Sequence, residues 1–249
     1  MQARTDDHAE TPAGLTTICL AAAALAALAC WPALVTGDVF LFHDSAAYLS
    51  AGREILAFVA DMATSATTGG GGDNGGMAAG DGDGPVFLRS FAYSAFAASV
   101  TALGGAPLLV FLQAWLASVV ALSLLPRAAL RPGAWPFALA MALTTLPWFS
   151  VFVMPDIFAA IIVAYAAVLW RLFDRLSRTH RLLLVALASA ACLAHYGNPP
   201  LAAGLFALVL AGRLVQRRMG LSVLAAAALP VLMGPLANPA NVRRQLVGI

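Results

Sequence analysis

Long stretches without a charged side chain are the feature that most constrains the fold of this chain. The first runs from Leu15 to Val35, and a helix needs about 20 apolar residues to cross the hydrocarbon core of a bilayer. Hydrophobic residues make up 61% of the sequence and charged residues 10%, whereas a soluble domain carries about 25% charged residues. The sequence therefore predicts an all-α, multi-pass membrane protein with a single integral membrane domain over residues 1–249.

About seven apolar segments are expected to form a transmembrane helical bundle. After the first, they are Pro107–Leu125, Trp135–Phe152, Ile157–Leu172, Leu182–His195, Pro199–Val215 and Leu221–Leu236. The segment that ends at His195 is the shortest, and an apolar run of about 10 to 14 residues also fits a re-entrant helix. The three cysteines lie inside apolar segments, so we interpret Cys19, Cys30 and Cys192 as small buried hydrophobic residues.

Residues 36–106 are expected to form a long external loop that contains two juxtamembrane helices. Apolar residues recur along Ser45–Met62 at helical spacing with polar residues between them, which predicts an amphipathic helix on the membrane surface. Val86–Leu103 has a similar periodicity and predicts a second interfacial helix. The glycine-rich residues 64–84 between them are expected to be a flexible hinge, and the polar residues 1–13 a disordered tail.

The arginines predict the orientation of the chain in the membrane. With seven spans and a cytoplasmic N-terminus, three arginine clusters lie on one side, which the positive-inside rule assigns to the cytoplasm. These clusters are Arg127 and Arg131; Arg171, Arg175, Arg178 and Arg181; and Arg213, Arg217 and Arg218. Arg243 and Arg244 follow the seventh segment and would be external in this topology, which departs from the rule. We therefore expect a protein of the cell (inner) membrane whose first loop is external.

Polar residues able to carry chemistry gather at the external ends of these segments. They are His43, Asp44 and Tyr48 after the first span; Arg89 and Tyr93 in the second juxtamembrane helix; and Asp156, His195 and Asn198 at the ends of later spans. Polar residues at a membrane boundary indicate a functional site when they converge. Each also has a structural interpretation: Asp44 and Asp156 as helix N-caps, Arg89 as a side chain that reaches the interface, and His195 as an ordinary residue at a helix end.

This arrangement resembles the N-terminal half of the GT-C membrane glycosyltransferases, over roughly residues 15–215. The shared features are a first helix, a long external loop with an acidic residue directly after that helix, two juxtamembrane helices, and an acidic residue in the next external loop. The resemblance implies transfer of a sugar from a polyprenyl-phosphate donor to a glycan, lipid or protein acceptor on the external face. In this resemblance, Asp44 would be the catalytic base and Asp156 would bind a divalent metal ion or the acceptor. Arg89 would bind the phosphate of the donor.

The other candidate residues fit the same reaction. His43 and His195 are alternative proton carriers, because histidine titrates near neutral pH. Tyr48 and Tyr93 suit stacking on a sugar or a position at the lipid boundary, and Asn198 is a further candidate for substrate binding.

Two features depart from that family. Its members usually have more spans, and its frequent paired acidic motif is absent, because His43 and Ser45 flank Asp44. A non-catalytic multi-pass protein is the alternative: a transporter, a structural subunit of a membrane complex, or a truncated and inactive relative. A polar cavity near the middle of the bundle would favour a transporter, whereas a funnel open to the outside would favour the enzyme. Nucleic acid is not an expected partner.

Overall fold

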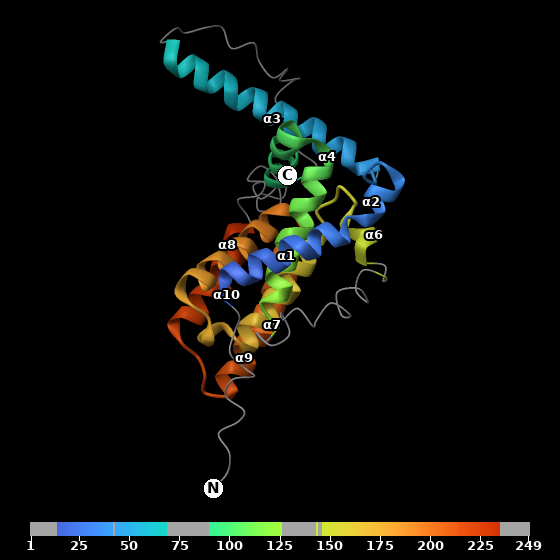
Figure 1. Ribbon diagram of the computed structural model, residues 1–249. Coiled ribbons are helices and arrows are strands. Elements are labelled where there is room, and N and C mark those ends of the chain that lie inside the picture. Colours follow the sequence, from blue (N-terminus) through green and yellow to red (C-terminus); the bar gives the residue numbers. More distant parts are fainter. Residues whose placement is uncertain (1–13, 42, 69–89, 126–142, 144–145, 235–249) are drawn as a thin grey trace.

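The computed structural model describes residues 14–41, 43–68, 90–125, 143 and 146–234. Within these ranges the regular elements are all helices, and an isolated β-bridge pairs Phe40 with Phe152. The helices are α1 (Leu15–Ala29), α2 (Trp31–Thr36), α3 (His43–Thr68), α4 (Phe91–Leu122), α6 (Leu146–Ser150), α7 (Ile157–Arg171), η3 (Phe173–Arg175), α8 (Arg178–Ala194), α9 (Asn198–Val215) and α10 (Leu221–Met233) (Figure 1). The predicted all-helical class is confirmed for this part of the chain.

Three of the described helical stretches are long and apolar enough to cross a membrane. They are Leu15–Thr36, Phe91–Leu122 and Asn198–Val215, while α7 and α10 are apolar but shorter. The predicted number of about seven spans is therefore not confirmed. Most of the predicted span Trp135–Phe152 lies outside the described residues, and at its end the helix α6 gives way to a turn and the bridge at Phe152.

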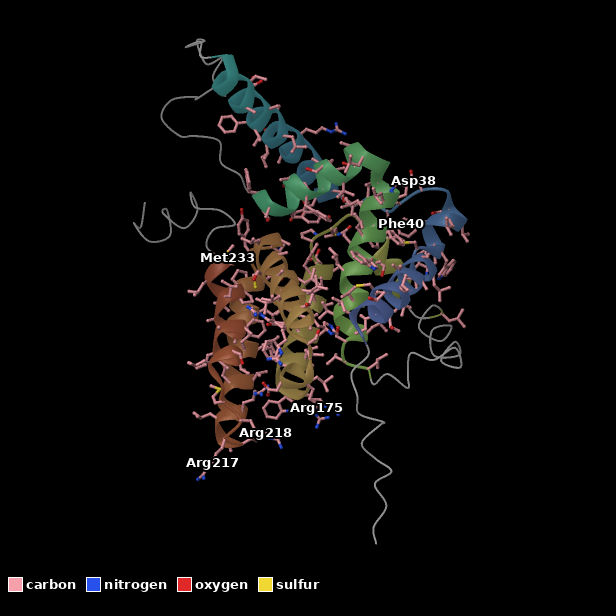
Figure 2. The ribbon with its side chains drawn as sticks, turned by 60° about the vertical axis from the view of Figure 1, so that its left-hand side comes forward. Asp38, Phe40, Arg175, Arg217, Arg218 and Met233 are labelled. Carbon is pink, nitrogen blue, oxygen red and sulfur yellow. The ribbon has the colours of Figure 1, made fainter. Side chains whose placement is uncertain are left out.

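The helix α4 occupies the centre of the molecule, with α1 on one side and α7 and α8 on another. The helices α7, α8, α9 and α10 pack side by side, and α3 lies across α4 at one end (Figure 1). Asp38 and Phe40 mark that end, while Arg175, Arg217 and Arg218 lie at the opposite end (Figure 2). We call these the loop end and the arginine end. Two of the three predicted arginine clusters are described, and both lie at the arginine end; Arg127 and Arg131 lie outside the described residues.

The boundaries of α3 and α4 differ from the sequence prediction. The helix α3 begins at His43 and reaches Thr68, so the first residues assigned to the glycine-rich hinge are helical; no glycine precedes Gly69 in that segment, and the rest of it lies outside the described residues. The predicted helices Val86–Leu103 and Pro107–Leu125 are joined as α4. A break at Gly104 and Gly105 separates its two halves, and the φ of 72° at Gly105 is one that only glycine adopts easily.

Within the bundle, Tyr165 of α7 completes the hydrogen bonding of α10. Pro230 lies inside α10 and has no N–H to donate to the carbonyl of Ala226, its partner in a regular helix. The Tyr165 hydroxyl donates to that carbonyl instead, at 3.0 Å. The side chain of one helix therefore satisfies a backbone group that the neighbouring helix cannot.

The arginine end is held by polar contacts that reach into the bundle. Arg213 of α9 is 2% exposed, forms an ion pair with Asp174, and donates to the carbonyls of Leu169 and Arg218. Because Leu169 is in the last turn of α7, the guanidinium satisfies a carbonyl that has no partner within its helix. Arg213 thus closes α7 against α9 rather than extending into the surroundings, as a surface arginine would.

Candidate functional site

Two segments far apart in the sequence pair at the loop end. The backbone N–H of Phe40 donates to the carbonyl of Val151 at 3.1 Å, and the N–H of Val153 donates to the carbonyl of Phe40 at 3.1 Å. The Phe40 ring stacks on Trp148 with centroids 5.6 Å apart and also contacts Phe152 at 5.4 Å. This pairing fixes the segment that leads into α3 beside the segment that leads into α7, which are the segments that carry the two predicted acidic residues.

Asp44 lies in the first turn of α3 instead of preceding the helix. The N-cap interpretation of Asp44 is therefore wrong, because α3 begins one residue before it. A carboxylate in the first turn is favoured by the partial positive charge at a helix N-terminus. The next residue, Ser45, is buried and donates its hydroxyl proton to the carbonyl of Val153 at 2.8 Å. The backbone of His43 begins α3, and its side chain is outside the described part of the structure.

Asp156 occupies the N-cap position of α7 without capping it. Its backbone is helical, with φ −63° and ψ −28°, and its side chain accepts no capping hydrogen bond. A side-chain cap normally requires an extended backbone, which directs the carboxylate toward the free amides. The capping interpretation of this side chain is therefore wrong as well, and the carboxylate is exposed.

Tyr48 and Tyr93 form a buried aromatic pair beneath the paired segments. Their ring centroids are 4.9 Å apart and their planes are perpendicular, an arrangement that is favourable for two aromatic rings. Tyr48 is 4% exposed and Tyr93 is 1% exposed, so the two rings support the loop end from inside.

Gln113 completes this group, and the sequence analysis did not identify it. It lies in the second half of α4 and is completely buried. Its Nε2 donates to the Tyr93 hydroxyl at 3.2 Å and to the carbonyl of Met154 at 2.8 Å. The signal in the sequence was an amide side chain inside the otherwise apolar run Pro107–Leu125.

His195 and Asn198 form a second group at the junction of α8 and α9. The Nδ1 of His195 accepts a hydrogen bond from the N–H of Gly197 at 3.0 Å, and the Nδ2 of Asn198 donates to the carbonyl of Ala191 at 2.7 Å. The buried Asn198 amide therefore satisfies one of the last carbonyls of α8. Ser90, which caps α4, donates to the carbonyl of Leu193 at 2.6 Å and joins this junction to the start of α4.

The structure thus brings most of the candidate residues to one end of the molecule, in two neighbouring groups. Asp44, Tyr48, Tyr93 and Asp156 form the first, together with the unpredicted Gln113. Arg89 lies outside the described residues. Among the residues that are described, no group of three or more histidine, cysteine, aspartate or glutamate side chains could hold a metal ion.

An apolar cavity lies directly below the first group. It has a volume of about 240 Å³ and is lined by α1, α4, α6 and α7. Its lining includes small side chains such as Ala117, Ala121 and Ala160, together with Ser150 and Ile157. Ser150 and Ile157 flank the segment 151–156, so the cavity borders the segment that carries Asp156.

Comparisons with known proteins provide no assignment of family or function for this chain. The chain matches no protein-family model, and no curated protein and no solved structure is significantly similar to it.

Proposed function

We propose that this protein is a membrane glycosyltransferase that uses a polyprenyl-phosphate sugar as donor and acts at its loop end. The observation that carries the proposal is the position of the apolar cavity beside the segment that carries Asp156, which pairs with the segment that leads to Asp44. A donor of this kind is an amphiphile with a long apolar chain and a polar head group. Its chain suits a cavity of aliphatic side chains, and its head would then lie at the segment that ends in Asp156.

The residues at the loop end supply the proton transfer that the reaction needs. An acceptor hydroxyl must lose its proton as it attacks the sugar, and a carboxylate within reach can accept that proton. Asp44 is the proposed base, and the Ser45 hydrogen bond to Val153 fixes the first turn of α3 against the opposite segment. Asp156 is proposed to orient the acceptor or the sugar, because its exposed carboxylate is not used for capping.

Positive charge at the departing phosphate would stabilise the transition state. Arg89 is the proposed source of that charge, on the strength of its position in the sequence next to Ser90, which the structure places at the loop end. The lining of the cavity is apolar, a property that favours an amphiphile over a polar solute carried through the bundle. This is the reason for preferring the enzyme over a transporter.

The test is sugar transfer by the purified protein in liposomes, with a panel of polyprenyl-phosphate sugars and equal amounts of folded protein. Asp44→Asn preserves the shape of the side chain but cannot accept a proton, so kcat is expected to fall by about 10²- to 10⁴-fold. Asp61→Asn is the matched control, because Asp61 is an exposed acid further along the same helix. Full activity of Asp44→Asn would refute the assignment of the base, and no transfer by the wild type with any donor would refute the proposed function.

A second variant tests the role of the cavity. Ala117→Phe places a large side chain in the cavity wall, so the KM for a long-chain donor should rise while a donor with a short, soluble chain should be affected little. An equal effect on both donors would indicate that the chain does not bind there.

A further inference from the structure

Gln113 is a buried amide whose hydrogen bonds all point toward the loop end. Its Nε2 donates to the Tyr93 hydroxyl and to the Met154 carbonyl, at 3.2 and 2.8 Å. A carbonyl can only accept, so the contact with Met154 fixes which end of the amide faces the loop. The two N–H groups of the amide therefore join the first half of α4 to a residue two positions before Asp156.

The partners of Gln113 lead to both acidic residues of the candidate site. Tyr93 packs edge to face on Tyr48, which is one helical turn after Asp44. The segment that Gln113 contacts at Met154 is also the segment that Ser45 contacts at Val153. Gln113 thus contacts the segment 151–156 directly at Met154 and is connected to α3 through Tyr93 and Tyr48.

The amide is not well placed for stability alone. Its Oε1 is buried and has no hydrogen-bond partner among the described residues, and the same holds for the nearby Ser94 hydroxyl. A buried acceptor without a partner destabilises the folded state, whereas an apolar residue of similar size avoids that penalty. Leucine at this position removes the unpartnered Oε1 but also leaves the Met154 carbonyl without this donor, so the two effects on the stability of the bundle oppose each other.

We propose that Gln113 is a positioning residue that holds the segment 153–156 in place and so sets Asp156 relative to Asp44. The catalytic meaning of this placement rests on the proposed function, while the placement itself does not. Gln113 touches neither acidic side chain; it acts through the Met154 backbone and the Tyr93 hydroxyl. Replacing it should free the segment without unfolding the bundle.

The first test is cross-linking, which needs no substrate. Phe40→Cys and Phe152→Cys place a cysteine pair across the β-bridge, in a background in which Cys19, Cys30 and Cys192 are alanine. In that background, Gln113→Leu and Gln113→Met should slow disulfide formation at least about tenfold while the melting temperature stays within a few degrees. Ser99→Ala is the matched control, because the Ser99 hydroxyl bonds only within α4, and it should not change the rate. An unchanged rate in both Gln113 variants would overturn the proposal.

The second test is kinetic and uses the transfer assay. Gln113→Leu should lower kcat by about 10- to 100-fold and leave the KM for the donor nearly unchanged, because the cavity does not include Gln113. Slower cross-linking with an unaltered kcat would overturn the catalytic role of the placement. If the wild type transfers no sugar, the proposed function fails, and the cross-linking result still decides whether Gln113 positions the segment.

Discussion

Single side chains in this protein compensate for backbone groups that lack partners. Tyr165, Arg213, Asn198 and Gln113 each reach a carbonyl outside their own element. In the apolar interior of a bundle, a carbonyl without a donor is costly, so such contacts contribute more than their number suggests. Substitution of a single one of these side chains therefore measures the effect of losing one hydrogen bond on stability.

Tyr165→Phe should destabilise the protein by about 1 kcal/mol, because it leaves the Ala226 carbonyl without a donor. The measurement is thermal unfolding in detergent. Pro230→Ala supplies a backbone N–H for the same carbonyl, so Tyr165→Phe should cost clearly less when it is made in the Pro230→Ala background. Equal costs in the two backgrounds would show that the hydroxyl does not replace the missing helix bond.

His180 predicts a loss of stability at mildly acidic pH. Its Nε2 and the Ser123 hydroxyl are 2.9 Å apart, and burial lowers the pKa of His180 below its usual 6.5. The unfolded chain therefore binds a proton at His180 more tightly than the folded chain does. The contribution of neutral His180 to the free energy of unfolding is fully present above about pH 6.5 and is lost as the pH falls through the pKa of the folded state. Unfolding measured from about pH 5 to about pH 8, a range that spans the usual histidine pKa of about 6.5, should show this decline in stability. His180→Gln should flatten it, and an identical slope in that variant would contradict the assignment.

At the scale of elements, the contact between α3 and α4 depends on a glycine. A Cβ at Gly52 would lie 2.1 Å from the Ser94 carbonyl oxygen and 2.6 Å from the Cβ of Ala98. Both are too close for any side chain, so α3 rests directly on the backbone of α4. The same contact holds Tyr48 against Tyr93 and therefore shapes the loop end.

Gly52→Ala should separate the two helices and destabilise the protein by about 1 to 3 kcal/mol, the range typical of an overpacked contact. Gly204→Ala is the matched control: nothing lies within 4 Å of a Cβ at that position, and alanine favours a helix over glycine. Melting temperatures of both variants check this, and a Gly52→Ala protein as stable as the wild type would show that α3 moves without cost.

At the scale of the whole molecule, the polarity of the bundle predicts how it lies in a membrane. The described arginine clusters occupy one end and the paired segments the other (Figure 2), so from the positive-inside rule we predict that the arginine end faces the cytoplasm. The same prediction makes the loop end, with its acidic residues, external.

Cysteine labelling in intact cells checks this orientation. Ser50 on α3 and Thr179 at the start of α8 are both exposed and lie at opposite ends. In a background without native cysteines, Ser50→Cys should react with an impermeant thiol reagent in intact cells, and Thr179→Cys only after permeabilisation. The reverse labelling pattern would show the opposite membrane orientation and place the candidate site in the cytoplasm.

The sequence alone determined the properties that depend on local composition. Apolar runs and charge depletion predict helices of a membrane protein, and α7, α8 and α9 lie close to the predicted segments because proline, glycine and arginine mark their ends. The alternation of arginine-rich and arginine-poor ends follows from connectivity, so the grouping of Asp44, Asp156 and His195 at one end was also predictable.

Only the tertiary structure decided which of those residues meet and through what. The pairing of Phe40 with Phe152, the burial of Tyr48 and Tyr93, and the ion pair of Arg213 all join residues far apart in the chain, and local periodicity carries no information about such contacts. Whether Asp156 caps α7 depended on its backbone angles, which its neighbours in sequence did not fix. Gln113 was visible as an amide in an apolar run, but its partners exist only after α4 packs against the segment that leads into α7.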